Sequence, residues 1–291
     1  MNATIAAKNT STLPTNTLPV PRRTRFLSRD EGRIAYDDIG DGPLVILAPG
    51  IGDLRREYRF VAPALAAQGY RVVTMDLRGL GESDATFSRY DGKAVGDDII
   101  ALIRHIDAGP AVLMGSSMAA GSAVYAAAEA PELVSRIVLI GGFTRGPVVS
   151  APMKLLVRVL MSGPWRNAVW LGLHGTLFPL HKPEDHDEHR SKMRNNLREH
   201  GRSAALAQMM LSDHDHAEAR YDKVQAPSLF VMGTADPDFP DPIEEANEVA
   251  AAIGGEAFFI EGAGHYPHVE APELFLERVL VFLEPTRLAL E

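Results

Sequence analysis

The chain of 291 residues contains no cysteine. This absence excludes disulfide bonds, a thiolate nucleophile and every cysteine-ligated zinc site, and it leaves the redox compartment undetermined. A surplus of positive charge is also missing, because 29 Lys and Arg stand against 38 Asp and Glu, for a formal net charge of -9. We therefore expect no nucleic-acid partner, since such a partner needs a cluster of cations that neutralises phosphates.

Long apolar runs are absent as well. No window of the sequence approaches the roughly 18 apolar residues of a membrane span. Residues 1–23 are rich in Thr, Asn, Ser and Pro, and they lack the apolar core of about 7–15 residues that a signal peptide needs. We expect this segment to be a disordered tail, and the protein to be cytoplasmic with no membrane partner. The oligomeric state stays open.

From residue 24 onward, short apolar runs alternate with helical patterns. PLVILAPG (43–50), YRVVTMD (70–76) and SRIVLIGG (135–142) have the composition of strands that are buried on both faces. Strands that alternate with helices predict βαβ units. The expected fold class is therefore α/β, with a mostly parallel twisted sheet and helices on both of its faces.

The alternation is interrupted once. Residues 144–220 contain no buried-strand run, and their patterns predict several helices. This divides the chain into a core, formed by residues 24–143 and 221–291, and an inserted helical cap. Such an insertion usually lies over the carboxyl ends of the strands, where α/β folds bind ligands.

A tight bend of small residues joins a buried strand to an alanine-rich helix at Gly115-Ser116-Ser117-Met118-Ala119. The small residues stand two positions on either side of Ser117, which is the G-x-S-x-G nucleophile elbow with Ala in the last place. This bend presents the Ser117 hydroxyl and directs Ser116 elsewhere. The pattern predicts Ser117 as a nucleophile.

A serine hydroxyl needs a base and a group that orients the base. Asp236 follows the predicted strand 228–233, and His265 follows the predicted strand 256–262. The order Ser, Asp, His is the chain order of triads on this kind of sheet. All three residues follow strands, so a parallel sheet places them at the same edge. We predict Asp236 as the orienting acid and His265 as the base.

Several neighbours compete for these roles. Asp238 and Asp241 belong to the same loop as Asp236, so either is a rival acid. His268 is a rival base, which we expect nearer the surface. Asp76 and Arg78 resemble catalytic residues, but we expect them to hold a turn together.

An oxyanion hole requires two backbone N–H groups that point at the developing alkoxide. Met118, the first residue after the nucleophile, is one candidate donor. The second candidate is Ile51, in the loop Pro49-Gly50-Ile51-Gly52, where glycine lets the backbone approach closely.

With these residues together, the sequence resembles the α/β-hydrolase superfamily, in its serine-nucleophile, cap-bearing branch. The resemblance covers the two core segments. It rests on the motifs DLRGLGESD (76–84), GTADPDFP (233–240) and GAGHYPHVEAPELF (262–275). The chain departs from the family pattern at Pro49, where the family often has His, and at Ala119, where it often has Gly. Both departures keep the backbone donors and bear on substrate preference more than on catalysis.

The inserted segment supplies candidate pocket residues. Apolar and aromatic side chains there suggest a largely apolar pocket. Together with residues of the core, the candidates are Gly50, Trp165, Trp170, Phe178 and Tyr266.

Seven histidines in the insertion invite a metal interpretation, above all in EDHDEH (184–189) and DHDH (213–216). His214 and His216 are two residues apart, however, and diverge on a helix. We therefore expect a solvated, charged surface there and no metal site.

The resemblance implies a serine hydrolase that acts on a small, fairly hydrophobic ester, lactone or related acyl compound, with no metal or organic cofactor. A serine nucleophile argues against the dehalogenases and epoxide hydrolases of the superfamily, which use Asp at this place. The same triad also serves carbon–carbon bond hydrolysis, acyl transfer and cofactor-free perhydrolysis, and the sequence does not separate them. A hypothesis from another class is a small-molecule receptor or scaffold with little turnover.

Overall fold

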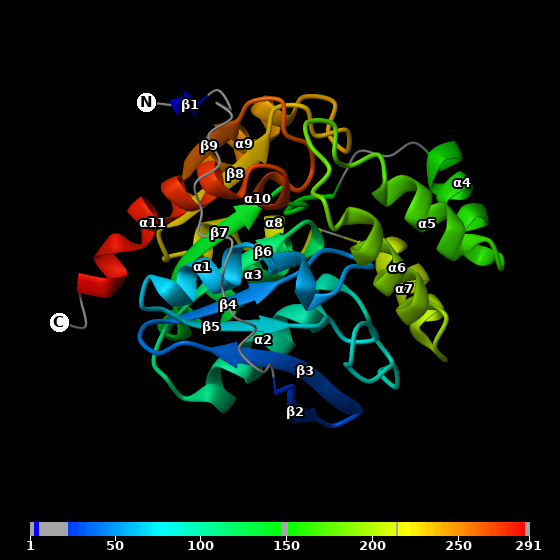
Figure 1. Cartoon of the computed structure of the whole chain (residues 1–291), viewed down its shortest axis with the longest axis horizontal. Helices are drawn as coiled ribbons and strands as arrows, with labels where there is room; N and C mark the ends of the chain where they lie inside the picture. Colours follow the sequence, from blue (N-terminus) through cyan, green and yellow to red (C-terminus); the bar gives the residue numbers. More distant parts are fainter. Residues whose placement is uncertain (1–2, 6–22, 147–150, 214, 289–291) are drawn as a thin grey trace.

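A nine-stranded sheet runs through the computed structural model, which describes residues 3–5, 23–146, 151–213 and 215–288. The strands are β1 (Ala3–Ile5), β2 (Arg25–Arg29), β3 (Gly32–Ile39), β4 (Leu44–Ala48), β5 (Arg71–Met75), β6 (Ala111–Ser116), β7 (Val134–Ile140), β8 (Ser228–Gly233) and β9 (Glu256–Ile260). Their order is β1-β9-β8-β7-β6-β4-β5-β3-β2 (Figure 1). β3 is antiparallel to both of its neighbours, and every other neighbouring pair is parallel. The expectation of a mostly parallel sheet is confirmed.

The central strand β4 shows why its sequence is continuously apolar. Val45 and Leu47 pack into the hydrophobic core on one face of the sheet. Leu44, Ile46 and Ala48 pack into the core on the other face. Because successive side chains of a strand point to opposite faces, a strand covered on both sides has no polar position.

Helices cover both faces of the sheet. α1 and α11 contribute to the core that contains Val45, and α2, α3 and α9 contribute to the core that contains Ile46. Their bounds are α1 (Val61–Ala67), α2 (Gly92–Ile106), α3 (Met118–Glu129), α9 (Pro242–Ala252) and α11 (Pro272–Leu288). Shorter helical turns are η1 (Arg55–Tyr58), η2 (Pro131–Leu133), η3 (Tyr221–Lys223) and α10 (Pro267–Glu270). The predicted α/β class with helices on both faces is therefore confirmed.

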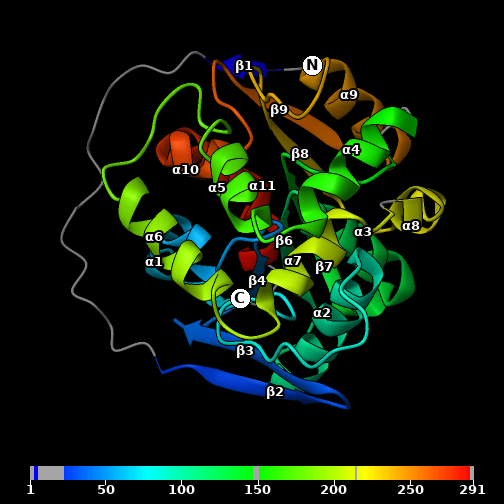
Figure 2. The ribbon, with the colours of Figure 1, turned by 90° about the vertical axis from the view of Figure 1, so that its right-hand side faces the viewer.

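Between β7 and β8 the chain forms a helical insertion. Its helices are α4 (Ala151–Ser162), α5 (Arg166–His174), α6 (His186–Leu197), α7 (Arg202–Met210) and α8 (Asp215–Glu218). Figure 1 shows α4–α7 grouped at one side of the molecule, and Figure 2, seen from that side, shows α5, α6 and α7 in front of the sheet.

The insertion contacts loops at the carboxyl ends of the strands. The His265 N–H, in the loop after β9, donates to the Leu177 carbonyl at 3.1 Å. The Trp170 ring packs on Gly52, in the loop after β4. The insertion therefore lies over the edge of the sheet where the predicted site residues gather.

The first residues of the chain differ in part from expectation. Of the segment 1–23, Ala3–Ile5 form β1 beside β9, and the rest of the predicted tail, apart from Arg23, lies outside the described residues. β2 is a strand that the sequence pattern did not predict, because only Leu27 of its five residues is buried. In the part of the chain that the structure describes, no helix has the length and apolarity needed to cross a membrane.

Candidate active site

Ser117 occupies the bend between β6 and α3, in a backbone conformation that side chains rarely adopt. Its φ is 55° and its ψ is -123°. Among the described residues, only Asp107 shares a positive φ without being glycine. Such strain costs about 1–3 kcal/mol and persists where the surrounding structure enforces it, often at functional sites.

The closeness of strand and helix explains the small residues of this bend. A Cβ placed on Gly115 would lie 2.2 Å from the Ala119 carbonyl oxygen. Ser116 is fully buried, and within the described chain its hydroxyl has no hydrogen-bond partner. Ser117, at 7% exposed, is the more accessible of the two hydroxyls.

The loops after β8 and β9 bring Asp236 and His265 together. The His265 Nδ1 atom lies 2.8 Å from Asp236 Oδ2, and both side chains are buried. Asp238 is farther from the same nitrogen, at 3.6 Å, and is exposed. Asp241 caps α9 by accepting the Glu244 N–H. The geometry therefore favours Asp236 over both of its rivals as the partner of His265.

The surroundings of His265 raise its pKa. Burial alone would lower it, because a desolvated imidazolium is disfavoured. The charge of Asp236, its hydrogen bond to the ring and the charge of Asp238 outweigh burial and raise the pKa to about 9. Asp236 thus stabilises the protonated imidazolium.

The end of β7 connects Ser117 to this pair. The Ser117 N–H donates to the Ile140 carbonyl at 2.9 Å. A Cβ placed on the next residue, Gly141, would lie 3.3 Å from His265 Nδ1 and 3.5 Å from Asp236 Oδ2. The structure therefore brings the three predicted residues to one edge of the sheet.

The loop after β4 completes this neighbourhood. A Cβ placed on Gly50 would lie 3.1 Å from the Ser117 Cβ, so the loop backbone passes close to the hydroxyl. The Gly50 N–H is already bonded to Glu57 Oε2 at 2.9 Å. Ile51 follows it and is buried. Met118 is the first residue of α3, so its N–H has no carbonyl one turn earlier to bond within the helix.

Two of the candidate pocket residues, Phe178 of the insertion and Tyr266 of the His265 loop, form one aromatic group. Phe178 stacks on Tyr266 with ring centroids 4.9 Å apart. The Tyr266 hydroxyl would lie 3.6 Å from a Cβ on Gly50. Trp170 is buried against Gly52, whereas Trp165 is 50% exposed. The structure does not bring Trp165 to this group.

The expectation that the histidines of the insertion lie on a solvated surface is wrong for three of them. His174, His186 and His189 are buried rather than solvated. His189 Nε2 lies 2.6 Å from Asp53 Oδ1, a buried carboxylate in the loop after β4. In α6 the buried residues are His186, His189, Met193 and Leu197, and this spacing is the sequence signal of a helical face that packs against the core.

His268 is the second correction. It is fully buried, not near the surface, and its Nε2 lies 2.9 Å from Glu57 Oε1. His214, which was part of the metal interpretation, lies outside the described residues. His216 is half-buried beside the ring of Tyr125.

Asp76 holds a turn, as the sequence predicts, whereas Arg78 ties its loop to α2. Asp76 accepts the Arg55 N–H at 2.7 Å and the Glu82 N–H at 2.9 Å. Arg78 forms a two-pronged ion pair with Asp98, with both contacts at 2.8 Å.

One group of side chains has the spacing of a metal site. Among the described residues, the only three His, Asp or Glu ligand atoms within 4.8 Å of one another belong to Asp236, Asp238 and His265. Two of these residues are already hydrogen-bonded to each other through Nδ1. A metal ion there would have to displace that bond.

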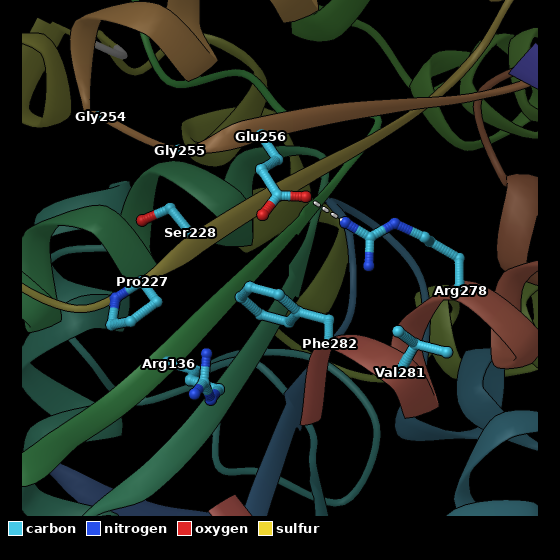
Figure 3. A pocket seen from close by; sticks show the side chains of 9 residues that line it. All are labelled: Arg136, Pro227, Ser228, Gly254, Gly255, Glu256, Arg278, Val281 and Phe282. Atoms are coloured by element: carbon cyan, nitrogen blue, oxygen red, sulfur yellow. Dashed lines mark hydrogen bonds and ion pairs between the residues drawn. The ribbon is translucent and has the colours of Figure 1, made fainter. Parts of the chain in front are cut away.

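A surface pocket of about 470 Å³ lies away from this site, at the amino ends of β8 and β9. Figure 3 shows that Arg278 and Glu256 are paired across it and that Phe282 forms part of its wall. None of the predicted site residues lines this pocket. In parallel α/β sheets the ligand site belongs to the carboxyl ends of the strands, so this pocket is a poor candidate for the chemistry.

The profile of the Alpha/beta hydrolase family matches residues 45–278. The chain belongs to this family. The match confirms the resemblance read from the sequence motifs, and it covers the elbow, the loop after β4 and the loops that carry Asp236 and His265.

Two curated relatives are similar to this chain over most of its length. An acetyltransferase component of the acetoin cleaving system (dihydrolipoyllysine-residue type) from Pseudomonas putida is 30% identical over 253 residues, which is 84% of this chain and 64% of that protein. The chain thus spans less than two thirds of that relative. A 2-hydroxy-6-oxononadienedioate/2-hydroxy-6-oxononatrienedioate hydrolase from Paraburkholderia phymatum is 29% identical over 271 residues, 87% of this chain and 91% of that protein.

A solved structure with the same fold is the bromoperoxidase from Bacillus anthracis. It superimposes with a TM-score of 0.80 at 20% identity and covers 90% of this chain and 100% of that chain. At this identity the likeness shows the fold alone.

Proposed function

We propose that this alpha/beta hydrolase is a serine hydrolase that cleaves small, fairly hydrophobic esters, lactones or related acyl compounds. The observation that carries the proposal is the buried His265–Asp236 pair, 2.8 Å apart, at the same sheet edge as the strained Ser117. The aromatic group of Phe178 and Tyr266 beside Gly50 supports an apolar acyl substrate.

In this mechanism the Asp236 carboxylate accepts the Nδ1–H of His265, which leaves Nε2 unprotonated. Nε2 takes the proton of Ser117 Oγ as that oxygen attacks the carbonyl carbon. The protonated His265 then gives this proton to the leaving alcohol, and an acyl-enzyme remains. A water molecule, deprotonated by the same nitrogen, releases the acid and restores Ser117.

Hydrogen-bond donors must stabilise the negative charge of the tetrahedral intermediate. The Met118 N–H begins α3 and is available for this role. The Gly50 N–H is held by Glu57, so the loop after β4 offers the N–H of Ile51. These two donors form the proposed oxyanion hole.

The helical insertion serves as the cap of this site. Ser117 is 7% exposed and His265 is 1% exposed. Substrate therefore reaches the serine when the insertion and the core move apart, and their return excludes water.

The test is the intact mass of the protein after incubation with a fluorophosphonate, for wild type, Ser117→Ala and Ser116→Ala. Ser116 is the matched control, since it is a neighbouring serine outside the proposed triad. We expect one adduct on wild type and on Ser116→Ala, and none on Ser117→Ala. An adduct that persists in Ser117→Ala would contradict the proposal. A folded wild-type protein without any adduct would favour the receptor or scaffold hypothesis.

Carbon–carbon bond hydrolysis is a second candidate, because the relative from Paraburkholderia phymatum is a hydrolase of an oxo-dienedioate and is matched over 91% of its length. Acyl transfer is a third, since another relative is an acetyltransferase component. Cofactor-free perhydrolysis would use the same triad. Product analysis separates them: a carbon–carbon hydrolase releases an acid from a vinylogous diketone, an acyltransferase requires an acceptor, and a perhydrolase requires peroxide.

A further inference from the structure

Asp53 is a buried carboxylate in the loop that follows β4. It is 1% exposed and lies two residues after Ile51, whose N–H belongs to the proposed oxyanion hole. Its backbone N–H donates to the Gly50 carbonyl at 3.3 Å, and its Oδ1 accepts the Leu54 N–H at 2.7 Å. The side chain and backbone of Asp53 therefore set the course of this loop on both sides of Ile51.

The remaining polar contacts of Asp53 come from the helical insertion. His189, on α6, places Nε2 at 2.6 Å from Asp53 Oδ1. His174, at the end of α5, places Nε2 at 3.4 Å from Oδ2, without hydrogen-bond geometry. Both histidine rings are buried.

The two histidines keep the carboxylate charged. Burial alone would raise the pKa of Asp53, but the charge of His189 and the contacts of His174 and His189 lower it below its ordinary value. Within the described chain, His189 Nδ1 and both ring nitrogens of His174 have no hydrogen-bond partner. Asp53 is therefore the main polar contact through which these rings meet the core.

We propose that Asp53 is a positioning residue through which the docked insertion fixes the oxyanion loop, so that the loop adopts its catalytic geometry only when the insertion is seated on the core. This inference rests on the proposed function, because it assigns a role to the loop in that chemistry.

The Gly50 side of the loop is held by residues of the core, so only the Asp53 side depends on the insertion. Glu57 bonds the Gly50 N–H and is itself paired with His268, and neither residue belongs to the insertion. Asp53 is contacted by His189 and His174, and both of these residues belong to the insertion. When the insertion lifts to admit substrate, Asp53 loses both contacts while Gly50 keeps its own.

The experiment compares Asp53→Asn and His189→Leu with two controls. His189→Gln keeps an N–H donor near the position of Nε2. Asn196→Ala removes another contact between α6 and the core, since Asn196 exchanges hydrogen bonds of 2.8 and 2.9 Å with the backbone of Gly81, outside the oxyanion loop. The kcat and KM for a p-nitrophenyl ester are measured below the melting transition of every variant.

We expect Asp53→Asn and His189→Leu to lower kcat by at least about tenfold, but by less than the roughly 10²–10³-fold that follows removal of an oxyanion donor itself. KM should change far less than kcat. His189→Gln should retain most of the wild-type kcat. Asn196→Ala should lose stability with kcat unchanged. The inference is overturned if Asp53→Asn keeps the wild-type kcat, or if Asn196→Ala lowers kcat equally.

Amide hydrogen exchange of residues 50–54 supplies a readout that does not depend on turnover. We expect faster exchange of this loop in Asp53→Asn and His189→Leu, and wild-type exchange in Asn196→Ala. Equal exchange in all variants would refute the role of Asp53. If wild-type protein neither hydrolyses esters nor forms the Ser117 adduct, the proposed function fails, and the exchange data still decide whether Asp53 and the insertion hold the loop.

Discussion

Glu57 Oε1 lies 2.9 Å from His268 Nε2, and both side chains are buried. The other oxygen of Glu57 accepts the Gly50 N–H at 2.9 Å. A histidine that follows the proposed base by three residues thus supports, through one carboxylate, the loop that approaches Ser117.

Glu57→Ala should destabilise the protein and weaken catalysis together. The change leaves the Gly50 N–H and the His268 ring without their partner, and each buried polar group left unpaired costs about 1–3 kcal/mol. Urea unfolding and kcat on one ester check both effects. Glu57→Gln, which keeps an oxygen and adds a donor, is the matched control and should lose less. An unchanged urea midpoint in Glu57→Ala would show that this pair does not support the loop.

The pH profile of ester hydrolysis should reflect the raised pKa of His265. The base acts only when neutral, so kcat/KM should rise with pH and its acid limb should have an apparent pKa above 6.5, toward the value of about 9. Asp236→Asn removes the largest favourable charge, so the limb should shift to lower pH while kcat falls by about 10⁴-fold. A wild-type limb below 6.5 would contradict this expectation.

The raised pKa of His265 also makes the stability of the fold depend on pH. The pKa of His265 is higher in the folded protein than its ordinary value of 6.5. Its pairing with Asp236 therefore stabilises the fold fully below about pH 6.5, and this contribution is lost as the pH rises through about 9. The loss should be absent from Asp236→Asn when unfolding is followed across that range.

The position of the site was predictable from the sequence because it depends on strand ends. Ser117, Asp236 and His265 each follow an apolar run, and parallel strands bring such positions to one edge. The sequence favoured Asp236 but left Asp238 as a rival, since both belong to one loop and only its folded course distinguishes 2.8 Å from 3.6 Å.

The buried histidines were missed for a different physical reason. Composition marks α6 as polar, and a polar helical face is usually solvated. His189 is buried because the insertion folds back onto Asp53, which is 136 residues earlier in the chain. β2 was missed because its side chains are largely exposed, so no apolar alternation marks it. Long-range packing thus explains the missed burial of His189, and solvent exposure explains the missed strand β2.

Gly115→Ala should strongly destabilise the elbow. The added methyl group would lie 2.2 Å from the Ala119 carbonyl oxygen, and overpacking of this kind costs about 1–3 kcal/mol or more. Gly172→Ala is the matched control, because Gly172 is an exposed residue of α5 with open space around its Cβ position. Alanine there should stabilise the helix by roughly 0.5–1 kcal/mol. Urea midpoints that move in the same direction would refute the argument.

Arg78→Met should be among the most destabilising changes outside the site. Arg78 makes two 2.8 Å contacts with the fully buried Asp98, and removing one partner of a buried ion pair costs about 3–5 kcal/mol. Arg29, at 3.0 Å, compensates only in part.

The dependence of this destabilisation on pH identifies its cause. Burial raises the pKa of Asp98 even with Arg78 and Arg29 present, so without Arg78 the carboxyl takes up a proton more readily. The difference in unfolding free energy between wild type and Arg78→Met should therefore shrink as the pH falls. Lys93→Met breaks the neighbouring but exposed pair with Asp97 and should cost at most about 1 kcal/mol. A pH-independent loss in Arg78→Met would mean that lost packing, rather than an uncompensated charge on Asp98, destabilises the variant.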